Sequence, residues 1–148
     1  MHRLWDGLNV GAILAAILLA ACNTGISDKS LRYINPDEAI TLAAGRDSLL
    51  GIGGVAAGVY IDPRPQADFD AERIPGAVHL PFDRVHHDHR DLIDYGALIV
   101  YGSDYNDSLA LAMSKRLIEL GHKEVHTLRG GLRAWKAAGN KVETGEGG

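Results

Sequence analysis

The residues best suited to chemistry lie in a polar loop between an apolar run and an amphipathic segment. The apolar run is Leu98-Ile99-Val100, and the amphipathic segment begins near Ser108. A strand, a tight loop and a helix in this order direct backbone N–H groups and a helix N-terminus into one small bowl, where a ligand is expected. The residues predicted to form this bowl are Gly102, Ser103, Asp104, Tyr105, Asn106, Asp107 and Ser108.

A histidine cluster offers a second kind of chemistry. His86, His87, Asp88 and His89 are consecutive and contain ligands that Zn²⁺ or Cu²⁺ accepts. In an extended segment, His87 and His89 would project on the same side. The simpler interpretation is a polar surface loop whose histidines have no ordered second shell. We therefore predict no metal site and no cofactor, and keep a metal-binding protein that uses these histidines as an alternative.

The elements that must position the loop alternate along the chain. Short apolar runs predict strands, and amphipathic segments between them predict helices, so the fold class is α/β with a mostly parallel central sheet of about five short strands and helices on both faces. The expected strands span 33–34, 59–61, 78–80, 98–101 and 125–128, and the expected helices span 36–44, 66–72, 108–120 and 132–138. With 148 residues the chain is long enough for one core and one globular domain.

Two helices carry specific signals. Asn35, Pro36 and Glu38 form the pattern of an N-cap, a proline at the first helical position and a capping box, and Gly45 is a typical stop. In the helix after the loop, an apolar stripe is predicted from Leu109, Ala112, Met113, Leu117 and Leu120. Between these helices, the glycine-rich stretch 47–58 is expected to be a loop or short turn that covers the core.

The N-terminal segment is predicted to lie outside the domain. Residues 10–21 form an apolar run that is short for a membrane span, which needs about 20 residues, and suits the h-region of a secretory signal. The run ends in Leu19-Ala20-Ala21-Cys22, which resembles the lipobox of bacterial lipoproteins. An uncleaved anchor and a soluble signal peptide are the alternatives.

The lipobox resemblance implies a lipoprotein signal peptide at residues 1–21 and acylation at Cys22. Residues 22–32 would then be a tether, and 141–148 a flexible tail. The protein would be exported to the bacterial cell envelope and held there, facing the periplasm, through its lipid anchor in the outer or the inner membrane. The mild net charge of −4 and the absence of a basic cluster argue against nucleic acid as a partner.

Three motifs in series resemble the rhodanese-like domain, the fold of thiosulfate and persulfide sulfurtransferases. The resemblance covers about residues 33–140 and implies the fold predicted above. The motifs are Tyr60-Ile61-Asp62-Pro63-Arg64 followed by Arg73-Ile74-Pro75-Gly76-Ala77, then Ile99-Val100-Tyr101 with its loop, then Arg129-Gly130-Gly131 followed by Trp135. For Asp62 and Arg64, the resemblance implies a role in supporting the pocket.

The loop departs from the family pattern, which reads approximately Cys-x-x-Gly-x-Arg-Ser. The resemblance places the family's cysteine at Gly102, its glycine at Tyr105 and its arginine at Asp107, and Ser108 is retained. Persulfide chemistry needs a thiolate held in positive potential. Because the only cysteine is Cys22, that chemistry is not expected here.

The sequence thus favours a rhodanese-like domain that has no catalytic residue and serves as a binding or interaction module. A protein partner or a small ligand would bind at the loop 102–108. An active sulfurtransferase that uses a nonstandard loop residue such as Ser103 is the first alternative, and it lacks a histidine base within the loop. A periplasmic metal-binding protein is the second.

Overall fold

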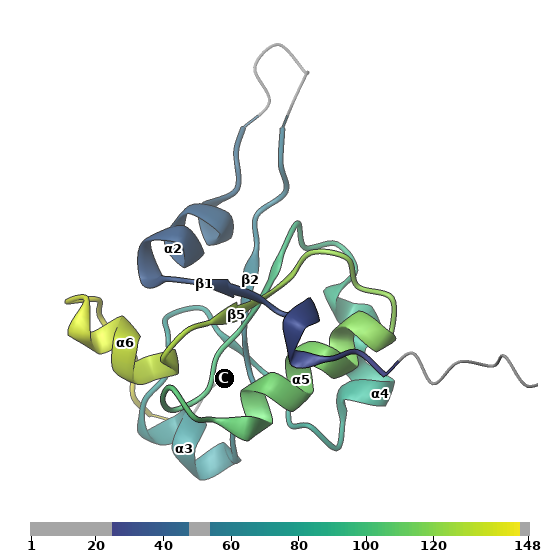
Figure 1. Cartoon of the computed structure of the whole chain (residues 1–148). Coiled ribbons are helices and arrows are strands. Elements are labelled where there is room, and N and C mark those ends of the chain that lie inside the picture. The colour runs from purple at the N-terminus through teal and green to yellow at the C-terminus, as the bar shows by residue number, and fades with distance from the viewer. Residues whose placement is uncertain (1–24, 48–53, 146–148) are drawn as a thin grey trace, which may run out of the picture.

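The fold is a five-stranded parallel sheet between two layers of helices. A computed structural model describes residues 25–47 and 54–145. The strands are β1 (Arg32–Ile34), β2 (Val59–Asp62), β3 (Val78–His79), β4 (Leu98–Val100) and β5 (Val125–Leu128). The helices are η1 (Asp28–Ser30), α2 (Pro36–Ala44), α3 (Gln66–Ala71), α4 (Val85–Asp88), η2 (His89–Leu92), α5 (Ser108–Glu119) and α6 (Gly131–Ala137). The architecture predicted from the alternating segments is confirmed (Figure 1).

The order of the strands, β1-β5-β4-β2-β3, puts β4 at the centre of the sheet. Val100 is in register with Ile61 of β2 on one side and with Thr127 of β5 on the other. Since all pairs are parallel, the segments that follow β2, β4 and β5 meet at one edge of the sheet. The loop after β4 therefore lies between the segment that follows β2 and the segment that follows β5.

Two apolar clusters attach the helices to the sheet. On one face, Met113 and Leu117 of α5 and Val85 of α4 pack with residues of β2, β4 and β5. On the other, Ala39 of α2 and Trp135 of α6 pack against the sheet in a second cluster. The Trp135 ring meets Tyr60 edge to face, with ring centroids 5.4 Å apart. The first cluster fixes α5, the helix that follows the loop, and the second cluster fixes α6, the helix that follows β5.

Local signals in the first helix are confirmed. Asn35 caps α2 and accepts a hydrogen bond from the Glu38 N–H at 3.0 Å, and the Glu38 carboxylate accepts one from the Asn35 N–H at 2.8 Å. The predicted stripe of α5 is only partly right. Its buried residues are Ala110, Met113, Ser114 and Leu117. Ser114 belongs to the buried face because its hydroxyl accepts a hydrogen bond of 2.8 Å from Thr127 of β5.

Segments near the ends and the glycine-rich stretch differ from expectation. Arg46 and Val55 pair as an antiparallel bridge, and the described residues beside this bridge point away from the sheet instead of covering the core (Figure 1). Residues 48–53 of that stretch lie outside the described residues. In the predicted tether, Asp28 forms an ion pair of 2.6 Å with Lys115 of α5, so this part is held against the domain.

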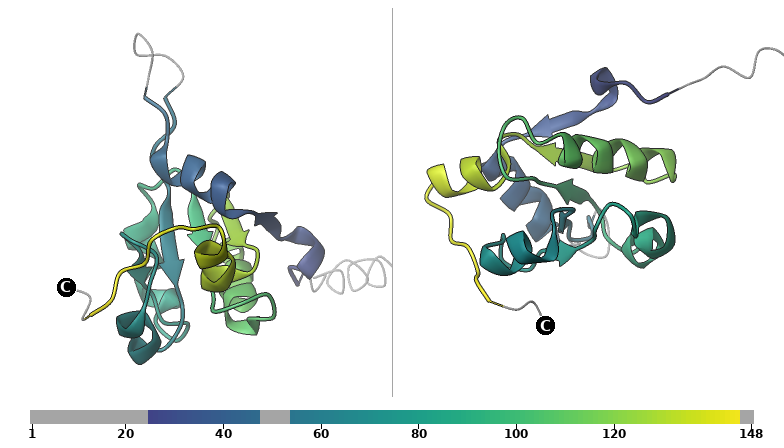
Figure 2. Two further views of the ribbon diagram at one scale, coloured as in Figure 1. Left: turned by 90° about the vertical axis from the view of Figure 1, so that its left-hand side faces the viewer. Right: turned by 90° about the horizontal axis from the view of Figure 1, so that it is seen from below.

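The C-terminal segment is also held, although it was predicted to be part of a flexible tail. Glu143 pairs with Arg73 through two backbone hydrogen bonds of 2.9 Å, and the Gly145 N–H donates to the carbonyl of Asp70 at 2.8 Å. Figure 2 shows the segment crossing from α6 to the side of α3. Cys22 and the predicted signal peptide lie outside the described residues. Among the residues described, no helix has the length and apolar character needed to cross a membrane.

Candidate functional site

The loop after β4 has the predicted arrangement of strand, tight turn and helix. Tyr101 and Gly102 are buried, the next four residues are exposed, and α5 begins at Ser108. Within the exposed part, the Asp104 carboxylate accepts a hydrogen bond of 2.8 Å from the Asn106 N–H, which closes a small turn. The loop is thus an ordered bowl at the C-terminal edge of the sheet.

The Asp107 carboxylate lies inside this bowl. Its Oδ2 atom accepts a hydrogen bond from the Ser103 N–H at 2.7 Å. Its Oδ1 atom accepts from the N–H groups of Leu109 and Ala110 at 3.0 and 3.2 Å, so Asp107 is the N-cap of α5. A carboxylate at this point is favoured by the helix dipole. The Asp107 side chain is therefore held by backbone donors at the start of α5.

The same carboxylate fills the space above Gly102. A Cβ atom added to Gly102 would overlap Cγ and Oδ2 of Asp107. Position 102 therefore accepts a side chain only if Asp107 moves or is replaced. Since Asp107 also holds three N–H groups, its displacement would leave those donors to find another acceptor.

The start of α6 is hydrogen-bonded to the backbone of the loop. The Gly102 carbonyl accepts a hydrogen bond from the Leu132 N–H at 2.8 Å, and the Ser103 carbonyl accepts one from Arg133 at 3.1 Å. Gly131 has a φ of 53°, and a Cβ atom there would overlap the Gly102 carbonyl. Glycine is needed at 131 because the two backbones touch. The sequence shows a Gly-Gly pair after the last strand. It does not show that the Gly102 carbonyl is the group that Gly131 touches.

Beside the loop, a pocket of about 320 Å³ opens between α5 and the ends of β1 and β5. Tyr105, which is 61 % exposed, forms one wall and lies against Gly130, where a Cβ atom would come within 2.6 Å of its ring. Tyr33 of β1 and Arg129 also line the pocket. Sequence reasoning missed both residues, because neither stands near the loop in the chain.

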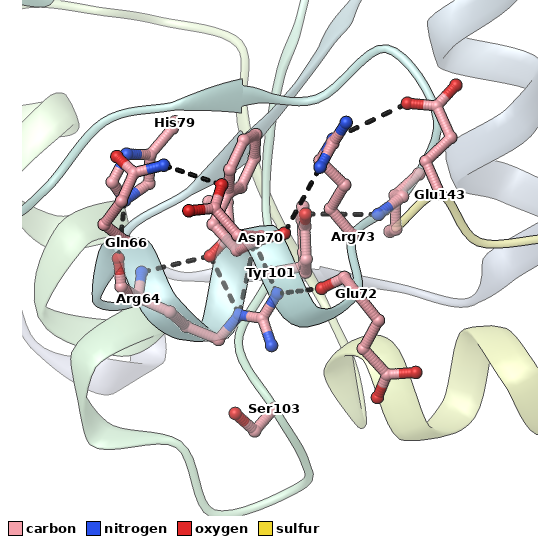
Figure 3. Close-up of polar contacts among 12 residues, drawn as sticks. Arg64, Gln66, Asp70, Glu72, Arg73, His79, Tyr101, Ser103 and Glu143 are labelled. Atoms are coloured by element: carbon pink, nitrogen blue, oxygen red, sulfur yellow. Dashed lines mark hydrogen bonds and ion pairs between the residues drawn. The ribbon is translucent and has the colours of Figure 1, made fainter. Parts of the chain in front are cut away.

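Asp62 and Arg64 form a buried ion pair at the end of β2, with residue exposures of 0 % and 5 %. The Nη2 atom of Arg64 lies 2.7 Å from Asp62 Oδ2, and it also donates to the Glu72 carbonyl at 2.8 Å. The pair thereby joins the end of β2 to the end of α3 (Figure 3). Burial alone would lower the pKa of Arg64, but the hydrogen bond and the charge of Asp62 raise it overall. Arg64 is therefore a permanent cation.

Tyr101 connects this ion pair to the loop. Its hydroxyl accepts a hydrogen bond of 3.2 Å from the Ile74 N–H, and the Arg64 guanidinium lies 5.6 Å from the centre of its ring. Burial, followed by the charge of Asp62, raises the pKa of the Tyr101 phenol well above its ordinary value. The phenol is therefore neutral at physiological pH and serves to position the residues on both sides of it.

The histidine cluster has a different arrangement from the one expected. His86 and His87 lie in α4 and His89 lies in η2, so the extended conformation is wrong. His89 Nδ1 is 3.2 Å from Nε2 of His122, a residue that no motif in the sequence singles out. Burial lowers the pKa of both rings. Within residues 25–47 and 54–145, no group of three or more His, Cys, Asp or Glu side chains is arranged to hold a metal ion.

Comparisons with known proteins agree on one family. Residues 47–138 match the family model described as the rhodanese-like domain. The chain is 30 % identical over 79 residues to a protein of Coxiella burnetii described as thiosulfate sulfurtransferase GlpE, an overlap of 53 % of this chain and 72 % of the relative.

Solved structures show the same likeness. The crystal structure of a rhodanese-like domain from Anabaena sp. is 28 % identical with a TM-score of 0.54, and the match covers 62 % of this chain and 97 % of that one. A thiosulfate sulfurtransferase from Pseudomonas aeruginosa gives a TM-score of 0.62 at 24 % identity, over 78 % of this chain and 20 % of that one. This second likeness concerns the fold alone.

Proposed function

Because the chain belongs to the rhodanese-like domain family, we propose that it is a member without sulfurtransferase activity that acts as a binding module at the loop 102–108. The observation that carries the proposal is the Asp107 carboxylate, which occupies the bowl above Gly102 and takes three of its N–H donors. A donor anion such as thiosulfate would meet a negative charge at this point. The Asp107 carboxylate is an anion that already occupies the bowl.

The chemistry of sulfur transfer supports the same conclusion. The reaction needs a thiolate that attacks the sulfur donor and carries a persulfide. We assign the family's cysteine position to Gly102, which has no side chain, and the single cysteine of the chain is Cys22. Ser103 is a poor substitute, because in the described residues its hydroxyl contacts no side chain that would act as a general base.

A binding role is supported by what surrounds the loop. Tyr33 and Tyr105 are exposed aromatic side chains that line the neighbouring pocket, and aromatic residues at a concave surface are typical of recognition sites. Arg129 gives the same pocket one positive group, and Asp104 and Asp107 give it two negative ones. We propose that a protein partner or a small ligand binds on this side of the molecule.

A thiosulfate:cyanide assay tests the absence of activity. The purified full chain is expected to form thiocyanate no faster than a heat-denatured sample of equal concentration, because no activated thiolate is available. Turnover above that background would contradict the proposal. The variant Cys22→Ser would then show whether the remaining thiol is responsible.

We extend the proposal to the location of the protein, which rests on the sequence Leu19-Ala20-Ala21-Cys22. The chain would be exported, cleaved before Cys22, acylated on that cysteine and held in the bacterial cell envelope with its domain facing the periplasm. No metal, cofactor or nucleic acid is needed for this role.

Labelling with a radioactive fatty acid in a bacterial host checks the anchor. The wild type is expected to take up label and to sediment with membranes, whereas Cys22→Ser is expected to lose both properties, since the acyl chain has no attachment point. The matched variant Ser103→Ala should behave as the wild type. Equal labelling of Cys22→Ser and the wild type would contradict lipidation at Cys22.

A further inference from the structure

The pocket beside the loop lies on the face of the sheet that α5 covers. Ile34 and Leu128 belong to the apolar cluster on the opposite face. Because successive residues of a strand face opposite sides of the sheet, Tyr33 and Arg129 project toward the α5 side. Arg129 continues the ladder of β5, since its N–H donates to the Ile34 carbonyl at 2.9 Å. The side chains of Tyr33 and Arg129 are thus directed to the side of the sheet where the pocket of about 320 Å³ opens.

The charge of Arg129 is not balanced within the protein. Its side chain is exposed and forms no hydrogen bond or ion pair with another described residue. Asp104 and Asp107 line the same pocket, yet no ion pair joins either carboxylate to the Arg129 guanidinium. A guanidinium is always charged in proteins and carries five N–H donors. These donors are therefore available to an anionic group that enters the pocket.

The two carboxylates of the pocket differ in how far their charge is already balanced. Asp107 accepts three backbone N–H groups at the N-terminus of α5, where the helix dipole favours a negative charge. The Oδ1 atom of Asp104 accepts one hydrogen bond of 2.8 Å, from the Asn106 N–H, and its Oδ2 atom has no donor in the described part of the chain. Asp104 is therefore the carboxylate with capacity for a cationic group.

The pocket lining also includes aromatic and aliphatic side chains. Tyr33 and Tyr105 are 46 % and 61 % exposed, and Leu111 of α5 lines the same pocket. The Tyr105 ring lies against Gly130, where a Cβ atom would overlap it. Apolar walls with a few polar groups are typical of small-molecule sites, whose volumes begin at about 300 Å³. The size and the walls of this pocket suit a small ligand with an apolar body.

Charge decides which class of small ligand the pocket accepts. A ligand with only a negative group would be attracted by Arg129 but repelled by Asp104 and Asp107. A ligand with only a positive group would be repelled by Arg129 and would leave the guanidinium unpaired. A ligand that carries one group of each sign meets an opposite charge for both groups.

We infer that this pocket binds a small zwitterion, of the class of the free α-amino acids with an aromatic side chain. Arg129 binds the carboxylate, Asp104 binds the ammonium group, and the aromatic ring packs against Tyr33 and Tyr105, since aromatic rings pair favourably. The inference rests on the proposed binding function and names the class of ligand for the same side of the molecule.

NMR titration of the isotope-labelled full chain, kept in solution with a nonionic detergent, tests the inference. The probe is L-phenylalanine, and two relatives each remove one charge while keeping the ring: hydrocinnamate lacks the ammonium group, and phenethylamine lacks the carboxylate. L-phenylalanine is expected to shift the backbone signals of Tyr105 and Gly130 in a saturable way. Each relative is expected to bind at least about five-fold more weakly, because one charge-assisted hydrogen bond is lost.

Single variants assign the two charges. Arg129→Gln is expected to bind L-phenylalanine about five-fold more weakly and phenethylamine no more weakly than the wild type does, because the amine has no group for the guanidinium. Asp104→Asn is expected to weaken L-phenylalanine by a similar factor without weakening hydrocinnamate. The matched control Arg133→Gln removes a positive charge from an exposed arginine outside the pocket lining and should leave binding unchanged.

Three results would overturn the inference: no saturable shift with L-phenylalanine, binding of either relative as tight as that of L-phenylalanine, or equal weakening by Arg129→Gln and Arg133→Gln. Any of them, without thiocyanate turnover, would leave the inactive assignment intact. Thiocyanate turnover would contradict that assignment independently of the titration, so the two failures are distinguishable.

Discussion

Replacing Asp62 with asparagine is expected to lower the free energy of unfolding by about 3–5 kcal/mol, the range for breaking a buried ion pair from one side. Asparagine has nearly the same shape as aspartate, so no cavity forms. The loss would arise because Arg64, with its side chain 6 % exposed, would keep its charge in the interior without a counter-ion. An arginine is not deprotonated in proteins at neutral pH, so loss of the proton offers no escape.

Urea denaturation at neutral pH measures this effect, and an exposed ion pair provides the control. Arg32 and Glu124 are 2.9 Å apart, but their side chains are 57 % and 55 % exposed. Solvent screens such a pair, so Arg32→Gln is expected to cost less than about 1 kcal/mol. If Asp62→Asn cost no more than Arg32→Gln, the central structural role given to the buried pair would be wrong.

A double-mutant cycle separates the ion pair from the other contacts of Arg64. Asp62→Asn and Arg64→Gln together are expected to destabilise the fold by less than the sum of the two single variants, because the second change removes the unpaired charge that the first one leaves. Additive effects would mean that the two groups do not interact.

The double variant Gly102→Cys with Asp107→Arg is expected to acquire a persulfide when it is incubated with thiosulfate, because the new thiolate attacks the outer sulfur and the S–S bond of thiosulfate breaks to release sulfite. The cysteine supplies the missing nucleophile, and the arginine replaces a negative charge with a positive one that stabilises a thiolate. The gain is the largest functional change that two substitutions should produce here, from no sulfur loading to stoichiometric loading. Cyanide-labile sulfur and the mass of the intact protein measure it.

The single variants show why both changes are needed. In Gly102→Cys, the new Cβ atom overlaps the Asp107 carboxyl group, so this variant is expected to load no sulfur and to be less stable. Asp107→Arg alone loses the N-cap of α5, which costs about 1–2 kcal/mol, and has no thiol in the loop. The assignment of Gly102 to the cysteine position fails if the folded double variant stays unloaded, or if Gly102→Cys alone loads equally well.

Local patterns in the sequence were sufficient for the elements and for the framework of the site. The capping box of Asn35 and Glu38 was predicted correctly because its atoms lie within one helical turn. β4 was predicted in the same way from an apolar run, and α5, which begins at Ser108, was predicted from amphipathic spacing. The parallel sheet followed from the alternation of these elements. Such features depend on neighbours in the chain, which a sequence displays directly.

Features that depend on distant partners were missed or predicted wrongly. Ser114 is buried because Thr127 of another element offers it a hydrogen bond. Glu143 is ordered because Arg73 pairs with its backbone. His89 lies beside His122, not His87, because the segment is helical and the end of α5 comes close to it. In each case the deciding neighbour is far away in sequence and leaves no local pattern.

What the sequence by itself determined about the loop is its composition: no cysteine, a glycine at 102 and a carboxylate at 107. Only the tertiary structure decided where that carboxylate goes. The N–H groups of Ser103, Leu109 and Ala110 converge when β4 and α5 pack, and an unpaired cluster of donors in that place attracts the nearest anion. Asp107 is that anion, and it fills the space above Gly102 because position 102 has no side chain to exclude it.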